Sequence, residues 1–260
     1  MVYIISVANQ KGGVAKTTTA ISLGAALASN GSNVLLVDTD AQANLTMHLG
    51  VDPSSVRQSI ANVLLTLNPL IHVIRSTSVP RLDLVPSNAE MELAERFLPI
   101  RKNYQYLLKN AVKNLPKYDY VIIDCPPSSG AVTANALHAS HMLIIPSQAE
   151  FFSIHALRNM LGFVKIIRKQ GNPDLIYRIL LTMYDGRNRI HRQLRDQLQS
   201  TFYEGLFHNM IGIDTKLRES SVIGLPITEY RPRSRSSLQY QALALEVVQH
   251  VHEYAIHTIQ

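Results

Sequence analysis

Short apolar runs alternate with longer helical patterns along this 260-residue chain, and this alternation limits the possible fold more than any other feature. The runs are rich in β-branched residues and are apolar at most consecutive positions, which is typical of parallel strands buried on both faces. Helical segments between them predict βαβ units. We therefore expect an α/β fold, a doubly wound, mostly parallel sheet with helices on both faces.

The chain contains no linker that would divide it, so a single domain over residues 1–260 is expected. Its first strand starts at once and leaves no room for an N-terminal helix-turn-helix domain. The expected strands cover residues 3–7, 33–38, 82–86, 118–126, 141–146, 177–183 and 210–213. The expected helices cover residues 16–29, 89–97, 103–114, 131–139, 153–170, 189–201 and 236–259.

Composition excludes several classes of protein. No apolar run is long enough for a transmembrane helix or a signal peptide, which favours a cytoplasmic protein. The single cysteine, Cys125, rules out intramolecular disulfides and cysteine-rich metal sites. The net charge is +6, and basic residues collect at 184–196 and 230–237. This asymmetry favours a polyanionic partner such as nucleic acid.

The stretch "VANQKGGVAKTTTA" lies between the first strand and the first helix. It departs from the usual phosphate loop, because Gln10 and Ala15 stand where that loop has glycines. Lys16 and Thr17 keep the positions that reach phosphate and Mg²⁺. If Ala15 has a helical φ, alanine fits there without strain. We expect an anion site at the helix N-terminus, and the alternative is a glycine turn without a ligand.

Three aspartates follow two other strands, at the edge where ligands bind in an open parallel sheet. Asp38 and Asp40 are two residues apart, so their carboxylates are expected on one side of the strand. Asp124 ends the apolar run "YVIID", which is the context of a carboxylate that holds Mg²⁺ through water. The alternative for each aspartate is a helix cap.

With these residues in place, the sequence resembles the ParA/MinD superfamily of deviant Walker-A ATPases over nearly its whole length. The deviant motif Lys-Gly-Gly-x-x-Lys-Thr matches residues 11–17, with Ala15 in place of the commoner glycine. "DTDAQAN" resembles the family's Asp-x-Asp-Pro-Gln motif, with Ala41 in place of proline. "VIIDCPPSSG" resembles its Walker B motif, and "GLPITEYRPRSRSS" resembles a segment near the end of ParA proteins.

The resemblance implies ATP and Mg²⁺ as cofactors and slow hydrolysis that a partner stimulates. Lys11 would reach across a homodimer interface to the nucleotide of the other subunit, and Asp40 would orient the attacking water. Asp38 and Asp124, with Thr17, would hold Mg²⁺, the two aspartates through water. The nucleotide contacts implied by the motif are Lys11, Gly12, Gly13, Val14, Ala15, Lys16, Thr17 and Thr18. Met183 and Pro226 are candidates for the adenine pocket, with a buried packing role as the alternative.

The ParA-type branch fits the sequence best. MinD-like members hold membranes through a basic amphipathic C-terminal helix, whereas the last stretch here has no lysine or arginine. Ligases of the dethiobiotin synthetase type share the phosphate loop and are the alternative from a different class. The ParA-type branch implies non-specific DNA binding on the nucleoid and a ParB-like or McdB-like adaptor, with a plasmid, chromosome or carboxysome as cargo. The DNA-binding candidates are Arg187, Arg189, Arg192, Lys216, Arg218, Arg231, Arg233 and Arg235.

Overall fold

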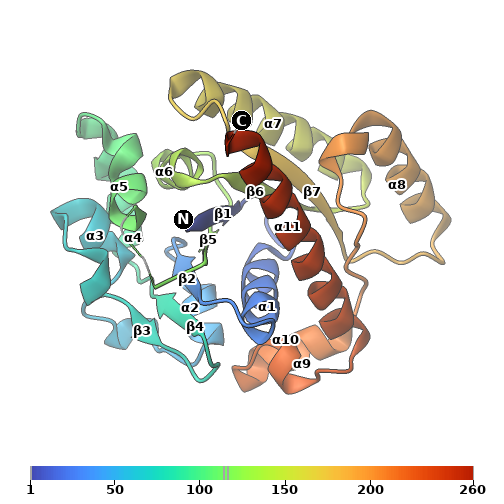
Figure 1. The fold of residues 1–260 in the computed structure, drawn as a ribbon, viewed down its shortest axis with the longest axis horizontal. Coiled ribbons are helices and arrows are strands. Elements are labelled where there is room, and N and C mark those ends of the chain that lie inside the picture. The colour runs from blue at the N-terminus through green and yellow to red at the C-terminus, as the bar shows by residue number, and fades with distance from the viewer. Residues whose placement is uncertain (1, 114, 116, 260) are drawn as a thin grey trace.

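The computed structural model describes residues 2–113, 115 and 117–259, and it contains one seven-stranded sheet within that part of the chain (Figure 1). The strand order is β3-β4-β2-β5-β1-β6-β7, and every pairing is parallel except that of the edge strand β3 with β4. The expected α/β fold with a mostly parallel sheet is confirmed. The strands are β1 (Tyr3–Val7), β2 (Val34–Asp38), β3 (Arg75–Ser76), β4 (Leu82–Val85), β5 (Tyr120–Asp124), β6 (Met142–Gln148) and β7 (Ile176–Thr182).

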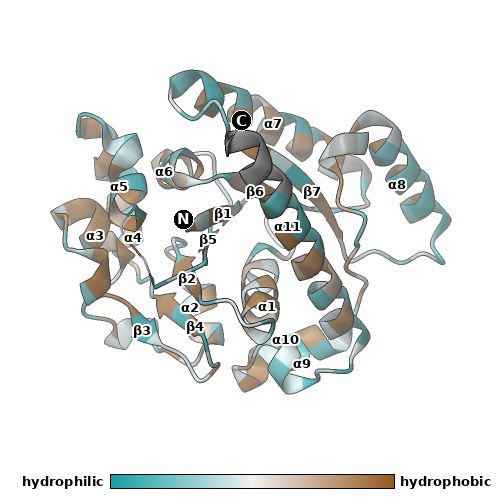
Figure 2. Ribbon diagram, in the orientation of Figure 1, coloured by the Kyte–Doolittle hydropathy of each residue, from teal (hydrophilic) through white to brown (hydrophobic). Residues whose placement is uncertain are grey.

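Helices cover both faces of the sheet because successive strand residues point to opposite sides. Ile5 and Val7 belong to a hydrophobic core that includes residues of α1 and α11. Ile4 points the other way and belongs to a second hydrophobic core, with residues of α3 to α8. Figure 2 shows the strands mainly in apolar colours and α8 mainly in polar ones. The helices are α1 (Lys16–Ser29), α2 (Asn44–His48), α3 (Ile60–Thr66), α4 (Met91–Phe97), α5 (Leu107–Val112), α6 (Ala131–Ala139), α7 (Phe151–Gln170), α8 (Arg189–Thr201), α9 (Thr215–Ile223), α10 (Ile227–Tyr230) and α11 (Arg235–Ile259).

Six of the seven expected helices are confirmed to within two residues at each end. The helix expected over 103–114 is wrong at its start, because Asn103 has a left-handed φ of 58° and a 3-10 turn precedes α5. Asn114 lies outside the described residues. The short helices α2, α3, α9 and α10 were not expected.

The strand expected over 210–213 does not form. This segment runs beside β7 and makes one isolated bridge, between Tyr184 and Gly212. The Gly212 amide instead donates to the Gln239 side-chain oxygen of α11 at 3.0 Å, so it is not available for a strand ladder. Ile211 is buried, whereas Ile213 is exposed, so the apolar run that resembled a strand in the sequence is only partly buried.

The C-terminal helix α11 packs along α1, as expected of a helix that closes the sheet. Its buried face contains Tyr240, Leu243, Ala244 and Val247. The side chains from residue 253 onward lie outside the described set. Among the helices that the structure describes, none combines the length and the apolarity needed to cross a bilayer.

Candidate functional site

The loop between β1 and α1 is held in place by two other strands of the sheet. The Asn9 side chain donates to the Pro146 carbonyl oxygen of β6 at 2.7 Å and accepts from the Lys11 amide at 3.0 Å. The Thr182 hydroxyl at the end of β7 donates to the Val14 carbonyl oxygen at 3.1 Å. A loop side chain bonded to the backbone of β6 and a side chain of β7 therefore fix the shape of this loop.

Ala15, the last residue of the loop, has a left-handed φ of 66° and ψ of 36°. The expectation of a helical φ there is wrong, although the helix does begin at the next residue, Lys16. A left-handed alanine costs on the order of 1 kcal/mol more than a glycine would. The loop contacts hold the chain in this conformation, in which Gly13 also has a positive φ of 72°.

The first turn of α1 has the features of an anion-binding site. In the described structure this helix has no side-chain cap and no acidic residue in its first turn, so no carboxylate occupies its N-terminus. Lys16 is 8% exposed, and its ammonium donates to the Lys11 carbonyl oxygen at 3.1 Å. Burial lowers the Lys16 pKa, while Asp124 and Asp40 oppose that shift. The ammonium thus lies over the loop with two carboxylates nearby.

Asp38 and Asp40 lie in different surroundings. Asp38 is fully buried at the end of β2, and its oxygens accept from the Thr46 amide, the Thr46 hydroxyl and the Asp40 amide. Burial raises the pKa of Asp38 to about 6, against the effect of these hydrogen bonds. Asp40 lies beyond the strand, so strand periodicity does not apply to it, and it lines a cavity with Lys16 and Thr17.

Asp124 is the least satisfied polar group near the loop. It pairs in register with Asp38 across β5 and β2 and is 1% exposed. Within the described residues, neither carboxylate oxygen of Asp124 makes a hydrogen bond. Burial and then Asp38 raise its pKa well above the usual value, and the nearby Thr17 hydroxyl and Lys16 oppose the shift. Carboxylate and hydroxyl oxygens are the donors that Mg²⁺ prefers, so Thr17 and Asp124 fit a Mg²⁺ site.

Two cavities meet at the loop and share Ala15, Thr18 and Ser221. Of the two adenine candidates, Met183 lines the smaller cavity, whereas Pro226 precedes α10 and is not among the lining residues of either. The larger cavity, of about 550 Å³, is lined by Gly12, Gly13, Ala15, Lys16, Thr17, Thr18, Asp40, Gln42, Asn44, Met47, His48, Pro127 and Ser221. The smaller, of about 370 Å³, is lined by Ala15, Thr18, Gln148, Glu150, Thr182, Met183, His191, Ile211, Gly212, Ile213, Asp214, Leu217, Arg218, Ser221 and Tyr240.

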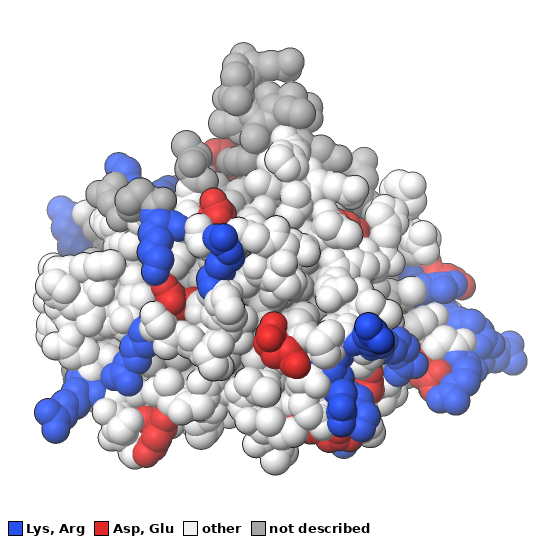
Figure 3. Space-filling model, turned by 60° about the horizontal axis from the view of Figure 1, so that its bottom comes forward, with Lys and Arg blue, Asp and Glu red and all other residues white. Residues whose placement is uncertain are grey.

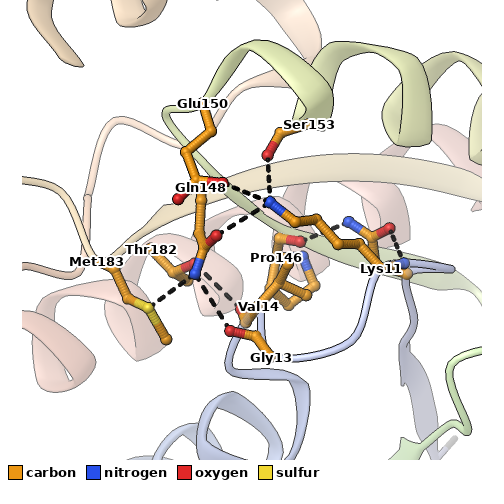
Figure 4. Close-up of polar contacts among 10 residues, drawn as sticks. Lys11, Gly13, Val14, Pro146, Gln148, Glu150, Ser153, Thr182 and Met183 are labelled. Carbon is orange, nitrogen blue, oxygen red and sulfur yellow. Dashed lines mark hydrogen bonds and ion pairs between the residues drawn. The ribbon is translucent and has the colours of Figure 1, made fainter. Parts of the chain in front are cut away.

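Lys11 turns away from the loop toward the junction of β6 and α7 (Figure 4). Its ammonium lies 2.6 Å from the Glu150 carboxylate and donates to the Gln148 side-chain oxygen at 3.1 Å and the Ser153 hydroxyl at 3.3 Å. The Gln148 amide nitrogen in turn donates to the Gly13 carbonyl oxygen at 3.2 Å. In this protomer three acceptors of its own chain therefore hold Lys11.

The basic candidates form two groups, one around the start of α8 and one where α9, α10 and α11 meet. Figure 3 shows Lys and Arg side chains gathered toward the right of the view, with further ones scattered elsewhere. Lys216 lies 2.8 Å from Glu219, and Arg187 pairs with Asp185 at 3.0 Å. The first group contains Arg187, Arg189 and Arg192. The second contains Lys216, Arg231, Arg233 and Arg235, whereas Arg218 lines the smaller cavity.

Sequence reasoning missed the polar residues that follow β6. Gln148 and Glu150 contact Lys11, and both line the smaller cavity. The signal was present, because "PSQAE" follows an apolar run in the same way that the aspartates follow β2 and β5. The strand-end rule applied to β6 would have found them.

Comparisons with known proteins agree on the kind of protein. A family model described as an AAA domain matches residues 2–177. The sporulation initiation inhibitor protein Soj of Bacillus subtilis is 39% identical over 246 residues, which cover 94% of this chain and 97% of Soj. The chromosome partitioning protein ParA of Caulobacter vibrioides is 35% identical over 249 residues, covering 94% of this chain and 93% of that protein.

Solved structures show the same fold. Cobyrinic acid a,c-diamide synthase from Mycobacterium smegmatis, with bound ATP analog and magnesium, superposes with a TM-score of 0.86 at 34% identity, covering 96% of this chain and 95% of that one. Apo McdA from Cyanothece superposes with a TM-score of 0.83 over 94% of this chain and 100% of that one. At 24% identity the second likeness shows the fold alone.

A parallel sheet with a glycine-containing loop and a lysine at the start of the following helix defines a nucleotide-binding protein of the P-loop class. The matching domain model and the relatives Soj and ParA narrow the class. The chain belongs to the ParA/MinD superfamily of ATPases, in its ParA-type branch.

The buried aspartates predict how stability depends on pH in the absence of Mg²⁺ and nucleotide. Because their pKa values are raised in the folded protein, their stabilising contribution is complete below about pH 4 and is lost as pH rises through about 6 for Asp38 and higher for Asp124. Asp124→Asn removes one buried charge. We expect it to raise the free energy of unfolding at pH 8 by about 1–3 kcal/mol. The decrease in stability with rising pH should therefore be smaller in this variant.

Urea denaturation at pH 5, 6.5 and 8 measures the effect, with the exposed Asp174→Asn as the matched control. An equal loss of stability in Asp124→Asn at all three pH values would contradict the assignment of a buried, unpartnered charge.

Proposed function

We propose that this protein is a ParA-type ATPase that binds ATP with Mg²⁺, forms a nucleotide-sandwich dimer, and binds DNA without sequence preference in the ATP state. One observation carries the nucleotide part: Asp124, a buried carboxylate whose oxygens make no hydrogen bond of normal geometry within the described residues, lies beside Lys16 and Thr17 at a helix N-terminus without a side-chain cap. Such an arrangement suits a bound cation and polyphosphate, whose charges would satisfy these groups.

Each part of the site has a role in this proposal. The loop amides and Lys16 bind the phosphates, and Thr17 and Asp124 hold Mg²⁺, with Asp38 ordering the loop that follows β2. The bound Mg²⁺ supplies charge neutralisation at the phosphates. Asp40, at the wall of the larger cavity, orients the attacking water. The nucleoside occupies the smaller cavity, beside Met183.

Dimerisation gives Lys11 its role. A second cation at the transferred phosphate stabilises the charge that shifts in the transition state. In the protomer, Lys11 is paired with Glu150, so it must exchange this carboxylate for the phosphates of the partner's nucleotide. Both are anionic, and the exchange keeps the ammonium paired.

We expect Asp40→Ala, which blocks hydrolysis, to be a dimer with Mg-ATP and a monomer with ADP. Adding Lys11→Ala to this variant should lower the dimer association constant at least about tenfold, since a charge-assisted contact of about 1.5–3 kcal/mol is lost. Lys109→Ala, at an exposed lysine of α5, is the control. Size-exclusion chromatography with light scattering measures the mass. A monomer with both nucleotides would rule out the sandwich dimer.

A groove of about 360 Å³ between α9 and the start of α11 supports the DNA part of the proposal. Its lining is basic and aromatic, and the Arg231 guanidinium lies 4.9 Å from the centre of the Tyr230 ring. Lys216 is half-buried there with Glu219 as its present partner. A DNA phosphate could bind in this groove through backbone contacts alone, which carry no sequence information. The groove is lined by Lys216, Tyr230, Arg231, Pro232, Arg233 and Ser234.

DNA binding should require ATP and fall with salt. If the dimer neutralises about six phosphates, its affinity should decrease on the order of a thousandfold between 50 and 200 mM salt. Replacing Arg231 and Arg233 by glutamate should abolish binding and leave ATP-dependent dimerisation intact, because neither lines a nucleotide cavity. Arg218 is unsuitable for this test since it lines the smaller cavity.

The matched control replaces Lys109 and Lys113 of the α5 region by glutamate, and fluorescence anisotropy with a labelled duplex measures binding. Equal affinity with ATP, with ADP and without nucleotide would show that the basic groove is incidental.

The remaining alternatives are less well supported. The solved relative named a cobyrinic acid a,c-diamide synthase is an amide-forming enzyme by its name, but one of the two curated relatives quoted above is named a chromosome partitioning protein and neither is named a ligase. A ligase would need ATP turnover that depends on a carboxylate substrate. A MinD-like membrane helix is not favoured, because apolar residues of α11 from Tyr240 to Val251 belong to one core with those of α1. We propose a cytoplasmic, nucleoid-associated protein with a ParB-like or McdB-like adaptor that stimulates hydrolysis.

A further inference from the structure

The N-terminus of α6 is capped by a side chain from a different helix. Both oxygens of Glu95, in α4, accept hydrogen bonds from backbone amides at the start of α6, from Ala131 and from Val132, each at 2.9 Å. The residue before the helix, Gly130, provides no side chain to do this. A carboxylate that receives two amides at a helix N-terminus is a strong contact, because the helix dipole adds to the hydrogen bonds.

Gly130 is required by this contact. A β-carbon at this position would overlap the Glu95 carboxylate, whose atoms would be its three nearest neighbours. The pair can therefore be disturbed from either side, by changing the carboxylate on α4 or by adding a methyl group on the loop before α6.

The loop between β5 and α6, which contains Gly130, borders the larger of the two cavities at the phosphate loop. It follows Asp124, and its Pro127 lines that cavity. The Gln10 side chain, from the loop after β1, donates to the Ser129 hydroxyl at 2.6 Å. The loop after β5 is thus held by Gln10 of the phosphate loop and, where it enters α6, by Glu95.

The chain just before α4 holds the loop after β2, which contains Asp40. The Ser87 hydroxyl donates to the Asp40 carbonyl oxygen at 2.7 Å, and the Ser87 amide donates to the Thr46 hydroxyl at 2.9 Å. Thr46 in turn donates to Asp38. The segment from Ser87 to Glu95 therefore connects the loop that presents Asp40 with the loop that follows Asp124.

We propose that Glu95 is a positioning residue for ATP hydrolysis: through its two hydrogen bonds to α6, it fixes the loop after β5 relative to Asp40. This inference rests on the proposed ATPase function. Glu95 does not touch the cavity that would hold the phosphates, so its loss should not weaken nucleotide binding. It should slow the chemical step, because small displacements of the groups around the reacting atoms cost large factors in rate.

The test compares steady-state hydrolysis of Mg-ATP in four variants. In Glu95→Gln one of the two accepting oxygens is replaced by a donor group, and kcat should fall about tenfold with KM changed less than about twofold. Gly130→Ala, which keeps the carboxylate and displaces it, should have the same effect. Their double variant should be no slower than either alone, because both break one contact. Glu92→Gln, at an exposed glutamate of α4, should match the wild type.

Hydrogen exchange at the Ala131 and Val132 amides gives an independent readout, and both amides should exchange faster in Glu95→Gln and Gly130→Ala. Faster exchange with an unchanged kcat would overturn the positioning role and leave Glu95 as a helix cap only. Additive losses in the double variant would also overturn it. A wild-type protein that binds Mg-ATP and never hydrolyses it, alone or with DNA, would instead overturn the proposed function.

Discussion

The site depends on the burial of one carboxylate, Asp124, at the end of a central strand. β5 lies between β1 and β2, so the phosphate loop is at one side of Asp124 and Asp38 is at the other. Burial beside a second aspartate makes the charged form costly, and the described residues offer it no hydrogen bond. A protein retains such a group when a ligand supplies the missing charge. The elements around it, from the Lys16 ammonium to the Thr17 hydroxyl, are arranged to share that ligand.

The surrounding loops are held by contacts with distant parts of the chain. Asn9 ties the phosphate loop to the Pro146 carbonyl of β6, Thr182 holds it from β7, and Ser87 fixes the Asp40 loop from beyond β4. Lys11 is held by Glu150 in the same manner. These contacts allow the loop to keep a left-handed alanine, and they connect the site to the helices that cover the sheet.

The sequence predicted what local pattern and strand ends determine. Apolar periodicity and motif spacing predicted the bounds of α1 and the phosphate loop before it. They also predicted the carboxylates at the strand ends. The sequence could not show the φ of Ala15, because the alanine is held there by contacts with β6 and β7. The strand expected over 210–213 failed for a similar reason, since a side chain of α11 takes the Gly212 amide. Glu95 was missed because its partners lie 36 and 37 residues away along the chain.

The central claim is that the buried Asp124 and the loop beside it form one site for Mg²⁺ and nucleotide. Isothermal titration of the wild-type protein with ATP, in Mg²⁺ and in EDTA, tests it most directly. We predict binding in Mg²⁺ that weakens at least about tenfold in EDTA, a loss of about 1.4 kcal/mol, and that shows no Mg²⁺ dependence in Asp124→Asn. No binding to the wild type in Mg²⁺, or the same Mg²⁺ dependence in Asp124→Asn, would contradict the account.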